Sequence, residues 1–296
     1  MEASYQPAAV VEAGLHGGRM PTKAANDVDM NVDLAVLGVQ EPPFSLSPDP
    51  RYFYLSSQHR TTLSKTNYTV AQQQGLAVIF GDIGTGKTTI ARRLFQQYDD
   101  RPDCSVAYIP TPHYRSAFQF LKAICAEFGL PPKASRPAQM GTFQAFLVDA
   151  LERNQNVVLI VDEAQLLVGT QFELIRQLLN FELNDRKLLQ IVILGQNQLR
   201  YKLDQKPELE SRAAALSTLD PLDFPDTRSM VEFRLMVAGR REPLFTDRGM
   251  GAVFDYSRGV PRRVCRLGLH VLPAAVGAGV QMIDEDLVMR VAEGLR

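Results

Sequence analysis

The sequence predicts an α/β fold in which helices cover both faces of a parallel sheet, followed by a smaller all-helical domain. Between residues 76 and 194, short apolar runs that are typical of buried strands alternate with segments of helical periodicity. After residue 219 only helical segments remain. We therefore expect a disordered arm over residues 1–33, an α/β domain over 34–219 and a helical lid domain over 220–296.

The α/β domain is expected to begin with a loop and a helix. Residues 41–50 are dense in proline, which predicts an extended segment, and an aromatic cluster follows directly. Ser56 or Ser57 can cap a helix over residues 58–74, and Gly75 can end it.

The remaining elements follow from apolar runs and periodicity. We expect strands at residues 76–80, 105–109, 157–161 and 190–194, and helices at 87–98, 115–128, 139–153 and 172–183. The lid is expected to hold helices at 227–238, 247–256, 261–272 and 284–295, with Asp284 as an N-cap.

One stretch of the lid is apolar enough to suggest a membrane segment. Residues 267–280 are only 14 residues long, whereas a spanning helix needs about 20 apolar residues. We interpret this stretch as a buried helix that breaks near Pro273, and we expect no membrane insertion by this chain.

A glycine-rich motif lies between the first strand and the next helix. The residues Gly81-Asp-Ile-Gly-Thr-Gly-Lys-Thr88 fit the pattern G-x-x-x-x-G-K-[ST]. Glycines let the loop turn its N–H groups onto phosphate oxygens, and the following helix adds its positive end. Lys87 is expected to reach the β- and γ-phosphates. The predicted nucleotide contacts in this loop are Gly81, Asp82, Ile83, Gly84, Thr85, Gly86, Lys87, Thr88 and Thr89.

An acidic pair follows the most apolar strand, about 75 residues after the glycine-rich motif. Asp162 is expected to hold Mg²⁺ together with the Thr88 hydroxyl, and Glu163 to act as the general base that polarises the attacking water. The two motifs predict a P-loop NTPase that uses ATP and Mg²⁺. An extra strand between the two motif strands favours the subclass in which a glutamate follows the magnesium aspartate.

The net charge limits how the protein could bind nucleic acid, and the cysteine content indicates the redox state of its compartment. The net charge is −1, so any binding to nucleic acid must use a local basic patch. The three cysteines lie far apart and form no pair in the sequence, which favours a reducing cytoplasm.

Several segments together resemble the AAA+ ATPases, and among them the general-secretion ATPases of the ExeA (GspA) type. The resemblance covers residues 34–296. It rests on residues 43–56 with His59-Arg60, on Asp162-Glu-Ala-Gln-Leu-Leu167, on Leu188-Leu-Gln-Ile-Val-Ile-Leu-Gly-Gln196 and on Gly259-Val-Pro-Arg-Arg263. Transposition helper ATPases of the TniB/TnsC kind are similar over the same span.

The resemblance implies roles for further residues. Gln196 would be sensor 1, with Asn197 as the alternative, and Arg262 would be sensor 2, with Arg263 as the alternative. Arg212 would be the arginine finger that acts in a neighbouring subunit of a homo-oligomer. Three alanines follow it, where the family usually has an arginine-rich run.

The aromatic cluster suggests a second part of the nucleotide site. Tyr54, Leu55 and His59 are candidates to line an adenine pocket, although an aromatic cluster is more often part of a core.

Two biological roles are compatible with such an ATPase. In the first, it is a DNA-associated regulator, such as a transposition helper that binds duplex DNA and recruits a transposase. In the second, it energises a secretion or pilus assembly system. The secretion-type relatives continue into a membrane span and a further module, whereas this sequence stops at Arg296. We therefore expect the first role and a cytoplasmic location.

Overall fold

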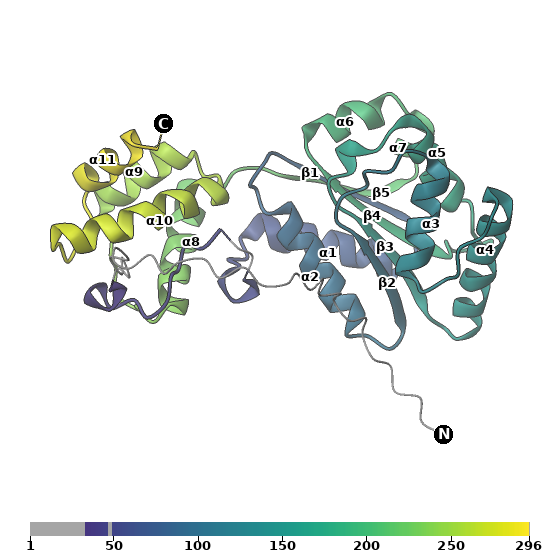
Figure 1. The fold of residues 1–296 in the computed structure, drawn as a ribbon, viewed down its shortest axis with the longest axis horizontal. Helices are drawn as coiled ribbons and strands as arrows, with labels where there is room; N and C mark the ends of the chain where they lie inside the picture. Colours follow the sequence, from purple (N-terminus) through teal and green to yellow (C-terminus); the bar gives the residue numbers. More distant parts are fainter. Residues whose placement is uncertain (1–32, 47–48, 296) are drawn as a thin grey trace, which may run out of the picture. The chain divides into compact units, whose positions relative to one another are not determined.

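The computed structural model describes residues 33–46 and 49–295. Within them, five parallel strands form a sheet in the order β2-β3-β4-β1-β5 (Figure 1). The strands are β1 (Leu76–Gly81), β2 (Cys104–Ile109), β3 (Asn156–Val161), β4 (Leu189–Gly195) and β5 (Ala213–Leu219). The predicted arm lies outside the described residues except for Asp33, whose side chain caps a short 3-10 helix.

Strand register places the predicted motifs at one edge of the sheet. Phe80 pairs with Gly195, and Val161 pairs with Ile193, so the carboxyl ends of β1, β3 and β4 lie side by side. The glycine-rich loop, the acidic pair and Gln196 each follow one of these ends. Ligands of open parallel sheets bind at this edge.

Helices cover both faces of the sheet, as the sequence predicts. On one face, α1 (Ser57–Ala71) and α2 (Lys87–Asp99) pack over alternate strand residues such as Ile79, Ile160 and Val192. The opposite face shares its core with the remaining helices of the α/β part. These are α3 (Ala117–Glu127), α4 (Arg136–Glu152), α5 (Gly169–Leu178), α6 (Asn197–Asp204) and α7 (Pro207–Glu210).

The strand β5 was not predicted. Its sequence is Ala-Ala-Ala-Leu-Ser-Thr-Leu, which lacks the β-branched apolar run of the other strands. It lies at the edge of the sheet and pairs only with β1 among the described strands, and alternate residues such as Leu216 remain exposed. An edge strand with one partner therefore forms without a strong sequence signal.

Four helices form the C-terminal part: α8 (Phe224–Val237), α9 (Asp247–Ser257), α10 (Pro261–Ala278) and α11 (Glu285–Glu293) (Figure 1). Asp284 caps α11, as predicted, by accepting a hydrogen bond from the backbone N–H of Leu287. The core of these helices also contains Phe44 from the proline-rich segment and the flanking residues Leu37 and Tyr52. The proline-rich segment and its flanks therefore pack against the C-terminal helices.

Some predicted element boundaries were wrong. Helix α10 continues through Pro273 to Ala278, because proline removes only one backbone N–H and this residue lies on a partly exposed face of the helix. Helix α1 ends before Gly75, with Gln72 as its C-cap. Helix α5 ends at Leu178, five residues earlier than expected.

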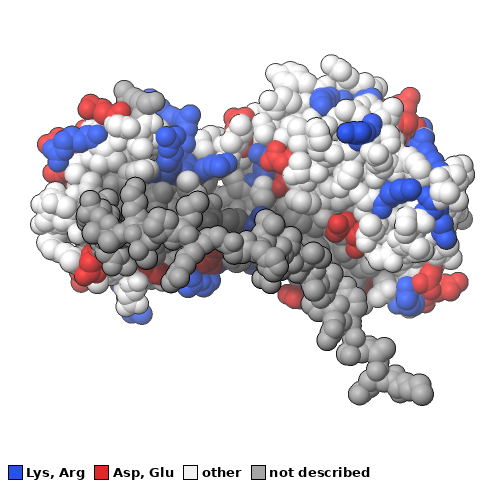
Figure 2. Space-filling model, viewed as in Figure 1, with Lys and Arg blue, Asp and Glu red and all other residues white. Residues whose placement is uncertain are grey.

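The surface carries charges of both signs. On the face that Figure 2 shows, basic groups form small separate clusters with acidic groups between them. Among the described residues, no helix combines the length and the apolar character needed to cross a bilayer.

Candidate nucleotide-binding site

The glycine-rich loop has the backbone conformation that a phosphate cradle requires. Gly84 and Gly86 have φ angles of 86° and 102°, which side chains disfavour. Helix α2 begins at Lys87 with no side-chain cap, so the N–H groups of its first turn remain available to an anion. The sequence prediction of a phosphate-binding loop therefore has the required local geometry.

The Lys87 ammonium lies inside this loop. Its Nζ donates hydrogen bonds to the carbonyl oxygens of Gly81 at 2.8 Å and Asp82 at 2.7 Å. Burial lowers the pKa of Lys87, with the nearby carboxylates opposing that shift. Neutral carbonyls are weaker partners for an ammonium than phosphate oxygens are, so a bound triphosphate would compete for the same donor.

The side chains of Thr88 and Asp162, the two predicted metal ligands, lie within hydrogen-bond reach of each other. The Asp162 side chain is buried, and burial raises the pKa of this carboxyl despite hydrogen bonds from the Thr88 side chain and the Glu163 backbone. Two oxygen donors beside a phosphate loop suit Mg²⁺, which keeps several waters and takes phosphate oxygens as further ligands. These residues therefore fit the predicted metal.

Glu163 has an unusual backbone. Its φ angle is 50°, in the left-handed region that a residue with a side chain adopts at a cost. Its Oε2 accepts hydrogen bonds from Nε2 of Gln165 and, at 3.4 Å, from Nε2 of Gln196. Glu163 and Gln196 both line the cavity described next, so the structure brings the predicted base and the predicted sensor 1 together.

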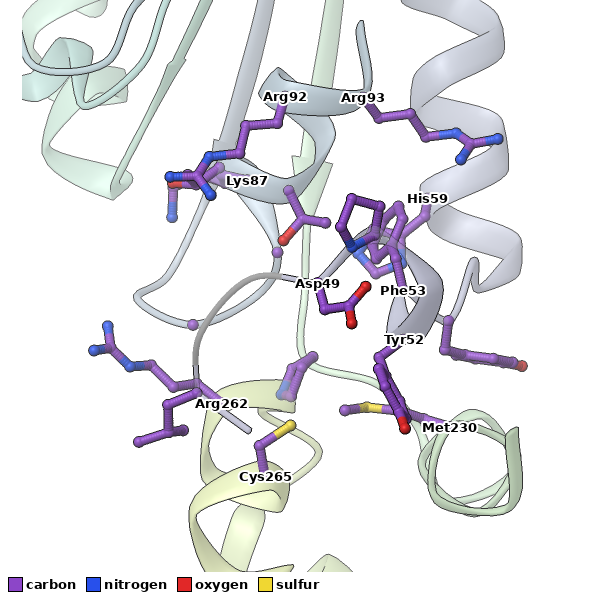
Figure 3. Close-up of a pocket in the computed structure, with 18 of the residues that line it drawn as sticks. Asp49, Tyr52, Phe53, His59, Lys87, Arg92, Arg93, Met230, Arg262 and Cys265 are labelled. Carbon is purple, nitrogen blue, oxygen red and sulfur yellow. The ribbon is translucent and has the colours of Figure 1, made fainter. Parts of the chain in front are cut away.

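A cavity of about 610 Å³ opens beside the loop (Figure 3). Basic and polar groups form one part of it: Gly84, Gly86, Lys87, Thr88, Thr89, Arg92, Arg93, Glu163, Gln196 and Arg262. Aromatic and apolar groups form another: Tyr52, Phe53, Tyr54, His59, Leu222, Met230, Pro261 and Cys265. A charged part next to an apolar part matches a nucleotide, whose base is apolar and whose phosphates are anionic.

The predicted sensor 2 lies at the loop. The backbone N–H of Arg262 donates to the carbonyl of Gly84 at 3.3 Å, and a Cβ on Gly84 would lie 2.8 Å from the Cβ of Arg262. The close approach of α10 to the loop therefore requires glycine at position 84. Arg263, the alternative, does not line the cavity.

Other predicted residues lie outside the cavity. Arg212 does not line it, and its Nη1 donates to Oδ1 of Asn180 at 2.6 Å. Asn197, the alternative sensor 1, donates from Nδ2 to Oδ1 of Asp82 at 2.5 Å.

The three candidates for an adenine pocket are divided between the core and the cavity. Leu55 packs against the core under α1 and α2, whereas Tyr54 and His59 line the cavity.

Two predicted contacts of the loop have structural roles in this conformation. Thr85 is buried, and its hydroxyl donates to the carbonyl of Asp82 at 2.9 Å. A Cβ on Gly81 would lie 2.7 Å from the carbonyl oxygen of Leu219. Both residues therefore hold the loop in shape.

His59 links α1 to the loop. Its Nε2 lies 3.1 Å from the carbonyl oxygen of Thr85, and its Nδ1 lies 2.9 Å from Oγ of Ser56. A carbonyl can only accept, so Nε2 carries the proton, and the neutral ring can accept from the Ser56 hydroxyl. Burial lowers the pKa of His59, which favours this neutral form.

Sequence reasoning missed several residues of the cavity. Met230, Leu222 and Cys265 come from the helical part, where nothing in the local sequence marks a ligand contact. Arg92 and Arg93 form a visible basic pair, and their place in the first turns of α2 after the loop was the available signal.

Comparisons with known proteins show which proteins this chain resembles. Residues 70–203 match the AAA domain family. The chain is 36% identical to the general secretion pathway protein A of Aeromonas hydrophila over 266 residues, which is 88% of this chain and 48% of that protein. The match to the AAA domain family thus covers the central part of the chain, and the likeness to this secretion pathway protein extends over most of the chain's own length. It spans about half the length of that relative.

Solved structures confirm the fold class. The ORC2 protein of Aeropyrum pernix superimposes with a TM-score of 0.63 at 16% identity, over 86% of this chain and 71% of that one. The Cdc6p protein of Pyrobaculum aerophilum gives 0.61 at 18% identity, over 85% and 70% of the two chains. At these identities the likeness concerns the fold: a P-loop parallel sheet followed by helices.

Proposed function

We propose that this protein binds Mg–ATP in the cavity beside the P-loop and hydrolyses it to ADP and phosphate. The observation that carries the proposal is the convergence of Lys87, Asp162 and Glu163 at one sheet edge, next to an apolar pocket. Lys87 and Arg262 would contact phosphate oxygens. Thr88 and Asp162 would hold Mg²⁺, which neutralises phosphate charge when bound.

The remaining chemistry belongs to Glu163 and Gln196. Glu163 lines the cavity and would accept the proton of the attacking water, since a carboxylate within hydrogen-bond reach can act as a general base. Gln196 lies 3.4 Å from the same carboxylate and could orient that water or bind the γ-phosphate.

Two variants test this assignment. Lys87→Ala should weaken ATP binding about 100-fold or more, equal to ~2.7 kcal/mol, because a charge-assisted contact to phosphate is lost. Glu163→Gln should bind ATP with nearly unchanged affinity and lower kcat about 100-fold or more, because the amide cannot accept the proton. Titration with a fluorescent ATP analogue and phosphate release measure both effects. Wild-type turnover in Glu163→Gln would refute the assignment of the base.

We propose further that the ATPase acts as a homo-oligomer, and two roles remain candidates for it. The 36% identical relative, named a general secretion pathway protein, favours an energising role in a secretion assembly. The DNA-associated role depends on exposed basic groups, and several of these are engaged elsewhere. Arg92 and Arg93 line the cavity, and Arg240 donates to the carbonyl oxygens of Leu37 and Pro243.

Arg263 and Arg266 are the basic pair that keeps the DNA-associated role testable. They are exposed on one face of α10, and neither belongs to an ion pair of the described residues. Arg266 donates from Nη2 to the carbonyl oxygen of Leu295 at 3.4 Å, which is a long hydrogen bond. If this face binds duplex DNA, replacing both by serine should reduce the ATP-dependent gel shift and flatten its dependence on salt. An unchanged shift, or none in the wild type with an ATP analogue, would favour the secretion role.

A further inference from the structure

We propose that Gln165 is a positioning residue that holds the carboxylate of Glu163 for catalysis, an inference that rests on the proposed ATP hydrolysis. The Gln165 amide lies between two neighbours. Its Nε2 donates to Oε2 of Glu163, and its Oε1 accepts from the backbone N–H of Gln196 at 3.0 Å. One side chain thus joins the end of β3 to the end of β4.

Chemistry fixes the orientation of this amide. The backbone N–H of Gln196 can only donate, so it must face the oxygen of the Gln165 amide. The amide nitrogen then necessarily faces Glu163, whose carboxylate can only accept. Reversing the amide would place two donors together and two acceptors together. The arrangement therefore specifies glutamine rather than any polar residue of similar size.

The surroundings are shaped for this side chain. A Cβ on Gly195 would lie 2.8 Å from Cδ2 of Leu199 and 2.9 Å from Oε1 of Gln165, so a side chain at position 195 would press on the amide in its present place. The backbone of Gln165 is also held, because Nζ of Lys202 donates to its carbonyl at 2.6 Å and to the carbonyl of Leu167 at 2.9 Å. Lys202 belongs to α6, the helix that follows Gln196.

Glu163 needs such support. Its backbone lies in the left-handed region, and its side chain reaches the cavity through three rotatable bonds. A hydrogen bond from Gln165 removes part of that freedom before the water arrives, which is how a positioned base gains rate. Gln165 itself does not line the cavity, so it acts through Glu163 without touching the nucleotide.

The second amide near Glu163 does not replace the first. Nε2 of Gln196 lies 3.4 Å from Oε2 of Glu163, which is a long hydrogen bond. Gln196 also lines the cavity, so bound nucleotide would compete for its amide. Gln165 is then the donor that remains on Glu163 throughout turnover.

The test compares two substitutions at position 165. Gln165→Leu removes both polar atoms at similar volume and should lower kcat about 10- to 100-fold, while the dissociation constant for a fluorescent ATP analogue stays within about threefold. Gln165→Glu keeps the shape but turns an oxygen toward Glu163, and like charges repel. At pH 8 its kcat should be at least as low as that of Gln165→Leu.

A pH series separates positioning from a structural role. Protonation of the carboxyl introduced at position 165 recreates an O–H donor toward Glu163, so kcat of Gln165→Glu relative to wild type should rise at least threefold between pH 8 and pH 6. The same ratio for Gln165→Leu should stay flat. Gln177→Leu is the matched control, because Nε2 of Gln177 donates to Oε1 of Glu173 at 3.0 Å outside the cavity. It should leave kcat unchanged.

The outcomes are distinguishable. If the wild-type protein binds the analogue but releases no phosphate, the proposed hydrolysis itself fails. If the wild type hydrolyses ATP and Gln165→Leu keeps its kcat within twofold, the positioning role is overturned. Should Gln165→Leu fail to fold, the near-isosteric Gln165→Glu provides the test by itself. If its kcat relative to wild type does not change between pH 8 and pH 6, the inference is overturned.

Discussion

At the scale of single residues, the nucleotide site holds charged groups at a cost. Lys87 and Asp162 are both buried. Burial lowers the pKa of Lys87 and raises the pKa of Asp162, so in each case it disfavours the charged form. Phosphate and metal would supply the counter-charges that protein groups supply only in part, so ligand binding and stability should be linked. His59 differs from this pair, because it is buried in its neutral form and fully hydrogen-bonded.

The burial of His59 predicts a pH dependence of stability. Its folded pKa is lowered below the ordinary value of 6.5, so below about pH 6.5 the unfolded chain binds a proton that the folded chain resists. The contribution of His59 is therefore complete above pH 6.5 and is lost as the pH falls, by up to about 1.4 kcal/mol per pH unit.

His59→Gln is the variant that isolates this effect. Glutamine can keep a donor near the carbonyl of Thr85 but does not titrate. Urea denaturation at pH 7.5 and pH 5.5 should show a smaller acid loss of unfolding free energy for the variant than for the wild type. Equal losses in the two proteins would mean that the histidine is protonated in the folded state as readily as in the unfolded one.

At the scale of elements, the sequence predicted those that carry their own pattern. The apolar runs of β1, β3 and β4 and the glycine-rich loop are sufficient by themselves to locate the edge of the sheet that carries the candidate site. The edge strand β5 was not predicted, because its small residues pair with β1 but show no strand pattern of their own in the sequence. The C-terminal part of helix α10 was not predicted, because the packing of a long helix outweighs the cost of one internal proline.

The same distinction applies to the site. Residues on the loop and at strand ends were predictable, because their positions follow from the strand that precedes them. The apolar part of the cavity was not predictable, because Met230 and Cys265 come from helices that lie far beyond the glycine-rich loop in the sequence. Their approach depends on tertiary packing between α8, α10 and the proline-rich segment. Gln165 could have been suspected only from its place two residues after the predicted base.

At the scale of the whole molecule, the placement of Arg212 matters most. It precedes β5, whose first residue Ala213 pairs with Leu76 at the amino end of β1. The P-loop follows the other end of β1, so the strand separates Arg212 from its own site by roughly 20 Å. An arginine side chain cannot cover that distance. If Arg212 takes part in hydrolysis, it must do so in the site of a neighbouring copy.

A complementation experiment tests this arrangement. Lys87→Ala and Arg212→Ala proteins should each hydrolyse ATP at least about 10-fold more slowly than wild type, because an arginine at a transferring phosphate contributes strongly to kcat. In a mixture, Arg212 of the Lys87→Ala copy can serve the intact P-loop of the Arg212→Ala copy. Phosphate release from the mixture should therefore exceed the sum of the two proteins measured separately.

Arg186→Ala provides the matched control. Arg186 is exposed, pairs with Asp185 and precedes β4 at the same amino-terminal edge of the sheet. This variant should keep the wild-type rate, and it should add nothing in a mixture with Lys87→Ala beyond its own activity. Wild-type turnover by Arg212→Ala alone would remove Arg212 from the mechanism. An inactive Arg212→Ala that co-assembles with Lys87→Ala without recovery would instead show that its loss acts within its own subunit, through the contact with Asn180 that holds the start of β5.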